Sequence, residues 1–139
     1  MRKLFFFGCA ITLTSCATTK QSAIFRSPME NPTEGKSTVC VIRPKTTFGS
    51  MVGSYITIDG KTVGKVGHAN YICWESEPGN HTLSAKAENT GNLQVNFAPD
   101  KKYYYKLDYS MGVWKARVNL VEIDSNEFSQ YQVDSKRGN

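Results

Sequence analysis

The 139-residue chain lacks most of the residues and motifs on which enzyme active sites depend. It has two histidines, His68 and His81, and neither the G-x-S-x-G turn of serine hydrolases nor the H-E-x-x-H helix of zinc proteases. It also has no glycine-rich phosphate loop. No apolar run reaches the roughly 20 residues that a membrane-spanning helix requires. These absences predict a protein without catalysis, cofactor, metal site or membrane-spanning helix. His81 follows a Pro-Gly turn, and we expect its ring to cap loop carbonyl groups.

The first sixteen residues have the pattern of an export signal. Arg2 and Lys3 precede an apolar run from Leu4 to Leu13, which has the length of a signal peptide. The run ends in Leu13-Thr14-Ser15-Cys16, which resembles the lipobox of bacterial lipoproteins. The resemblance implies that residues 1–15 are removed and that Cys16 carries the lipid.

The lipid predicts where the protein lies. Three acyl chains on Cys16 would hold it permanently on a membrane, since a single chain binds only reversibly. Ala17 follows the cysteine where an Asp would favour inner-membrane retention, so the resemblance implies an outer-membrane lipoprotein facing the periplasm. Without residues 1–15 the chain keeps fifteen basic and twelve acidic residues, a net charge of +3. This mild charge and the exported location predict no nucleic-acid partner.

The next segment predicts a flexible tether. Residues 16–36 contain two prolines and one glycine and show no sustained period, which is typical of a linker. We expect a folded β domain over residues 37–124. Residues 125–139 are expected to form a short helix over Glu127–Gln132 and a frayed tail.

Short runs of β-branched and aromatic residues alternate with turn signals through the predicted domain. Asp59-Gly60 is the strongest hairpin signal. Trp114, Ala116, Val118 and Leu120 have the same parity and are expected to share a face. The pattern predicts an all-β fold, an antiparallel β-sandwich or small barrel of seven to eight strands. The expected strands are Thr38–Ile42, Ser54–Ile58, Lys61–Val63, Tyr71–Ser76, His81–Ala87, Leu93–Phe97, Tyr103–Tyr109 and Trp114–Leu120.

The order of these landmarks resembles a family of small bacterial lipoproteins with an uncharacterised β domain, and also PEGA-like domains. PEGA domains are small sandwiches regarded as binding or scaffolding modules, so the resemblance implies fold and location and no catalytic residue. It covers about residues 37–124. The residues that carry it are Val39 to Pro44, Asp59-Gly60-Lys61, Val63-Gly64, Pro78-Gly79-Asn80-His81, Tyr103-Tyr104-Tyr105 and Met111-Gly112.

Two of the four cysteines, Cys40 and Cys73, lie in the predicted domain. An oxidising compartment favours a disulfide between them. Both stand in strongly apolar runs, however, where free cysteines pack as small hydrophobic residues. A zinc site with the two histidines is disfavoured, because the spacing differs from that of zinc ligands. The bridge and two separate core thiols therefore remain as alternatives.

Two surfaces are candidates for contact with a partner. Tyr104 lies between Lys102 and Lys106 on the strand face opposite the predicted core, where basic and aromatic side chains suit an anionic or glycan surface. Phe48 and Met51 are apolar residues on a glycine-flanked loop. We therefore expect a membrane-anchored, non-catalytic module that binds or scaffolds an envelope protein or peptidoglycan. The alternative is a small-ligand carrier or sensor with a pocket inside the β domain.

Overall fold

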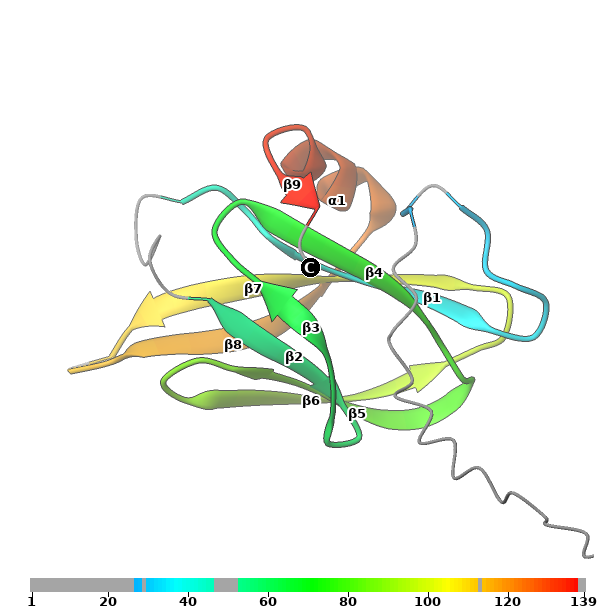
Figure 1. The fold of residues 1–139 in the computed structure, drawn as a ribbon, viewed down its shortest axis with the longest axis horizontal. Helices are drawn as coiled ribbons and strands as arrows, with labels where there is room; N and C mark the ends of the chain where they lie inside the picture. Colours follow the sequence, from blue (N-terminus) through cyan, green and yellow to red (C-terminus); the bar gives the residue numbers. More distant parts are fainter. Residues whose placement is uncertain (1–26, 29, 47–52, 113, 138–139) are drawn as a thin grey trace, which may run out of the picture.

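Two β-sheets packed face to face form the body of the protein, and one short helix lies against the outside (Figure 1). The structure is a computed structural model that describes residues 27–28, 30–46, 53–112 and 114–137. The larger sheet has the order β8-β7-β1-β4-β9 and the smaller one β3-β2-β5-β6, which confirms the predicted all-β sandwich. The strands are β1 (Ser37–Arg43), β2 (Ser54–Ile58), β3 (Lys61–Val66), β4 (Asn70–Ser76), β5 (Gly79–Lys86), β6 (Thr90–Phe97), β7 (Lys102–Met111), β8 (Ala116–Ile123) and β9 (Lys136–Arg137).

Strand β1 is the centre of the larger sheet. All seven of its residues are buried, and it pairs antiparallel with β4 and parallel with β7. Val39 and Val41 face the smaller sheet, whereas Cys40 and Ile42 face the opposite side. Burial on both faces explains why this strand is a nearly continuous apolar run instead of an alternating one.

The core between the sheets is filled by aliphatic and aromatic side chains from both layers. Because side chains alternate across a strand, Tyr105 and Leu107 of β7 point into this core while Tyr104 points away from it. The predicted parity of β7 is therefore confirmed. The buried members are Val39, Val41, Ile56, Val66, Ile72, Trp74, Leu83, Ala85, Phe97, Tyr105, Leu107, Val118 and Leu120.

Helix α1 (Ser125–Gln132) covers the outer face of the larger sheet. Its first turn is capped by Asp124, whose carboxylate accepts a hydrogen bond of 2.8 Å from the Glu127 amide. An eight-residue helix is too short to be stable alone, so packing must hold it. Phe128, 1% exposed, supplies that packing by placing its ring against those of Tyr71 and Tyr104.

Both ends of the domain are held more firmly than the sequence predicts. Within the expected tether over 16–36, the Thr33 amide donates to the Glu75 carboxylate at 2.6 Å, and the Gly35 amide donates to Asp100 at 2.8 Å. The expectation of a free tether up to residue 36 is therefore wrong for its last residues. At the other end, β9 pairs in parallel with β4 in a segment expected to be frayed.

Candidate binding surface and cavity

The predicted exposed face around Tyr104 is covered by the helix. The Tyr104 ring centroid lies 4.9 Å from that of Phe128, and burial raises the pKa of the Tyr104 hydroxyl. The Lys106 ammonium lies 3.3 Å from the Glu127 carboxylate of α1, and Lys102 is half-buried. The expectation of an open contact surface is therefore wrong for Tyr104 and Lys106, which the helix covers. The sequence places them on the correct side of β7 but does not reveal that α1 packs there.

The other predicted contact residues, Phe48 and Met51, lie outside the described residues. Large apolar side chains that are exposed to solvent are typical of contact sites, and we use them to find further candidate surfaces in the described part of the chain. Two of them, Met111 and Trp114, flank one turn. The large exposed hydrophobic residues are Tyr55, Met111, Trp114, Val121 and Val133.

The turn between β7 and β8 carries Trp114, the most exposed of these side chains. The described residues of this turn, Met111, Gly112, Trp114 and Lys115, are called the hairpin tip below. Trp114 is 93% exposed and Met111 is 72% exposed. The Gly112 amide donates to the Lys115 carbonyl at 2.8 Å and closes the turn. Trp114 precedes β8 and lies in this turn, beyond the core that Val118 and Leu120 of that strand enter.

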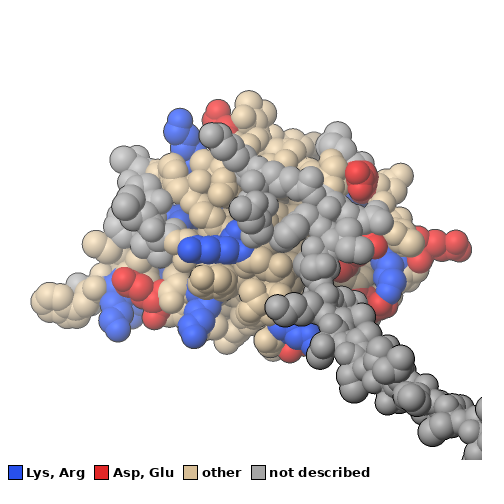
Figure 2. Space-filling view, viewed as in Figure 1, with Lys and Arg blue, Asp and Glu red and all other residues tan. Residues whose placement is uncertain are grey.

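The hairpin tip projects from one end of the molecule. In Figure 1 the β7–β8 hairpin reaches farther left than the strands of the smaller sheet. Figure 2 shows an uncharged surface at this projecting end, with both basic and acidic side chains next to it. Lys115 and Arg117 are both exposed, and a Cβ atom built on Gly112 would lie 3.1 Å from Arg117 Nε. A basic side chain therefore lies against the turn that carries the apolar pair.

The base of the hairpin is fixed to the smaller sheet. The Asn89 side chain accepts a hydrogen bond of 2.8 Å from the Val118 amide and donates one of 3.4 Å to the Val118 carbonyl. Glu88 accepts a hydrogen bond of 3.0 Å from the Ala116 amide. Side chains of the β5–β6 turn thus form hydrogen bonds with backbone groups at the edge of β8, which an edge strand would otherwise leave unpaired. The hairpin tip is consequently presented from a fixed base.

A cavity of about 290 Å³ lies where the end of β1 meets β7 and α1. Arg43, 1% exposed, borders it and stacks its guanidinium 4.0 Å from the centre of the Tyr109 ring. Burial lowers the pKa of Arg43, but a guanidinium remains charged at neutral pH. Lys45, Lys106 and the carboxylate of Asp108 also border the cavity, so its walls carry more positive than negative charge. The remaining lining residues are Pro44, Thr46, Leu107 and Tyr131.

The contact between His81 and Asp59 has the residue types of a catalytic pair, but its hydrogen bonds indicate a structural role. His81 Nδ1 lies 2.5 Å from the Asp59 carboxylate, and Nε2 lies 2.7 Å from the Glu77 carbonyl. The hydrogen bond from His81 Nδ1 and one from the Thr82 amide lower the pKa of Asp59. Both ring nitrogens face acceptors, so the ring links two turns and is not oriented towards a nucleophile. The predicted capping of a loop carbonyl by His81 is confirmed.

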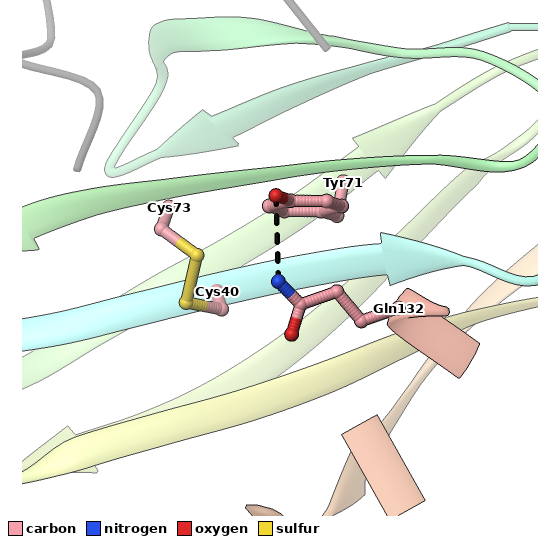
Figure 3. The surroundings of a disulfide bond; sticks show 4 residues. All are labelled: Cys40, Tyr71, Cys73 and Gln132. Carbon is pink, nitrogen blue, oxygen red and sulfur yellow. Dashed lines mark hydrogen bonds between the residues drawn. A yellow bond between two sulfur atoms is a disulfide. The ribbon is translucent and has the colours of Figure 1, made fainter. Parts of the chain in front are cut away.

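Cys40 and Cys73 are joined by a disulfide on the helix-covered side of the larger sheet (Figure 3). The two residues stand directly opposite each other in the β1–β4 register, with their Cα atoms 4.1 Å apart. Beside the bridge, the Gln132 side chain of α1 donates to the Tyr71 hydroxyl at 3.4 Å. Of the alternatives left by the sequence, the structure therefore contains the bridge.

Comparisons of the chain with protein-family models, curated proteins and solved structures find no match. Among the described residues, no group of three or more histidine, cysteine, aspartate or glutamate side chains is arranged to hold a metal ion. No helix in the described ranges is long and apolar enough to cross a bilayer.

Proposed function

We propose that the protein is a lipid-anchored, non-catalytic binding module of the bacterial cell envelope. Cys16 carries the anchor, and the β-sandwich lies on the periplasmic side of the outer membrane. The export pattern of residues 1–15 supports the location, as does the Ala17 that follows the lipobox cysteine. The bonding of His81 at both ring nitrogens supports a role without catalysis.

The observation that carries the binding role is the exposure of Met111 and Trp114 on the hairpin tip. Tryptophan is among the side chains that contribute most to binding when buried at an interface. Here it projects on a turn whose base is tied down by Asn89. A contact made by a preorganised tip costs little conformational entropy, which favours a recognition role.

Site-specific photocrosslinking in cells tests this function. A photoreactive amino acid replaces Met111 in the acylated chain, and the captured material is identified by mass spectrometry. Tyr55 is the matched control, since it is exposed on β2 in the other sheet. We expect position 111 to capture a defined envelope component, whether protein, peptidoglycan or lipid, and position 55 to capture none. Equal background labelling at both positions would contradict the binding role of the hairpin tip.

A small-ligand carrier is the second candidate function, and the cavity beside Arg43 favours it. The cavity lies at the end of β1, and its lining includes Leu107 and Tyr109 from the core side of β7 as well as Tyr131 of α1. Its excess of positive charge would suit an anionic molecule. Native mass spectrometry of the purified chain distinguishes the two functions, because a carrier would retain a small molecule that the Arg43→Met variant loses.

A further inference from the structure

We infer that the hairpin tip inserts into the interfacial region of an anionic lipid bilayer and gives the domain a second membrane contact. This inference rests on the proposed function and names the partner of the same surface. It places Trp114 and Met111 among lipid headgroups and upper acyl chains. It also places Lys115 and Arg117 at the level of the phosphates.

The side chains of the hairpin tip match the chemistry of a membrane interface. Tryptophan is enriched at this depth, because its large apolar ring and polar N–H suit a region that is apolar on one side and wet on the other. Met111 adds a flexible apolar side chain on the same turn. Their exposed fractions of 93% and 72% show that neither packs against the domain. Insertion would therefore bury these side chains without unfolding the domain.

The charges beside the tip complement an anionic surface. Lys115 and Arg117 are exposed, and Arg117 lies against Gly112 at the turn itself. The carboxylate of Glu88 accepts a hydrogen bond from the Ala116 amide at the base of the hairpin. Basic residues close to an anionic leaflet each favour association about fivefold. The arrangement of an apolar tip with basic flanks favours lipid over a neutral glycan or an apolar protein groove.

The predicted anchor keeps the tip within reach of the membrane. Ten residues separate Cys16 from Ser27, and a chain of that length spans at most about 35 Å. A domain of this size has a radius of gyration of about 13 Å. An acylated chain therefore holds the domain close enough for the hairpin tip to meet the same bilayer. Tethering makes this second contact intramolecular, so a weak interaction is sufficient.

Tryptophan fluorescence tests the inference directly, because the chain has two tryptophans in opposite environments. Trp74 is 3% exposed in the core, whereas Trp114 is almost fully exposed. The acylated full-length chain is reconstituted into vesicles of equal parts phosphatidylethanolamine and phosphatidylglycerol. The Trp114→Phe variant supplies the Trp74 spectrum, and the difference from the unmodified chain gives the emission of Trp114. The quenchers are lipids brominated on their acyl chains and acrylamide in the aqueous phase.

We expect brominated lipids to quench Trp114 and acrylamide to reach it poorly. In the Lys115→Gln/Arg117→Gln variant, the ratio of inserted to free tip should fall about fivefold for each charge removed. The matched control is Lys61→Gln/Lys65→Gln, which removes the same charge from exposed positions on β3 and should leave Trp114 unchanged.

Two results would overturn the inference. One is a Trp114 that acrylamide quenches freely and brominated lipid does not. The other is quenching by brominated lipid that is equal in vesicles of phosphatidylcholine alone, which would remove the role of anionic lipid. Failure of the chain to remain with the vesicles would instead contradict the lipid anchor of the proposed function. If the vesicle assay fails while position 111 still captures an envelope protein in cells, the binding function stands and its partner is that protein.

Discussion

Reducing the Cys40–Cys73 disulfide should remove a large part of the stability of the domain. The two cysteines are separated by 33 residues, and a bridge across such a loop restricts the unfolded chain. The chain-entropy relation gives a stabilisation of about 3.7 kcal/mol at 25 °C for that separation. Domains of this size have total stabilities of about 5–15 kcal/mol. We therefore expect the reduced protein to be folded but much closer to its unfolding threshold.

Guanidinium unfolding of the chain from residue 27 onwards, with and without reductant, measures this difference. Cys40 and Cys73 are the only cysteines in that segment, so alkylation of the denatured, unreduced chain should find no free thiol. The denaturant dependence should also be steeper after reduction, because the unfolded chain expands. The Cys40→Ala/Cys73→Ala variant is the control and should not respond to reductant. A free energy of unfolding that changes by less than about 1 kcal/mol on reduction would refute the argument.

Two further predictions concern contacts that hold the sheets and turns. Gly91→Ala should destabilise the domain by about 1–3 kcal/mol in thermal or chemical unfolding, because its Cβ would lie 2.6 Å from the Val118 carbonyl oxygen. Gly67→Ala has no contact that close and should be neutral or slightly stabilising; equal effects would contradict this account. The hydrogen bond from His81 lowers the pKa of Asp59 in the folded state. The stabilisation that this bond contributes is therefore fully present above the pKa of Asp59 in the unfolded chain, and it is lost as the pH falls through the lower pKa of the folded state. The Tm difference between the unmodified chain and Asp59→Asn should therefore shrink as the pH is lowered below about 4, and a constant difference would contradict the pairing.

The strands could be predicted because their signals are local. The Asp59-Gly60 turn has positive φ at both residues, 49° and 80°, as a two-residue hairpin of the favoured type requires. The strands that follow such turns have a period of two, which the sequence displays directly. By contrast, the parallel pairing of β1 with β7 joins segments about 64 residues apart in the chain. Nothing local in either strand specifies that partner.

The helix-covered face shows how a correct local prediction led to a wrong surface. The sequence predicts both a short helix near Phe128 and an outward-facing Tyr104, and the structure contains both. What it does not display is their contact. A physical signal was nevertheless present, since a helix of eight residues requires a packing partner. The outward side chains of β1 and β7, among them Ile42 and Tyr104, are the apolar surface that this helix covers.

The exposure of Met111 follows from the same period of two that defines the core. Along one face of the β7–β8 hairpin, Leu107 is 2% exposed, Tyr109 is half-buried and Met111 is 72% exposed. All three side chains point to the side of β7 that faces the smaller sheet. The apolar pattern of β7 therefore continues past the point where the smaller sheet ends and no longer covers it. Parity tells which face a side chain occupies, but only the relative lengths of the two sheets tell whether anything lies opposite. An apolar face extended beyond its own core, ending in a tryptophan with basic neighbours, is suited to burial in something outside the chain, and a bilayer close to the predicted anchor meets that requirement.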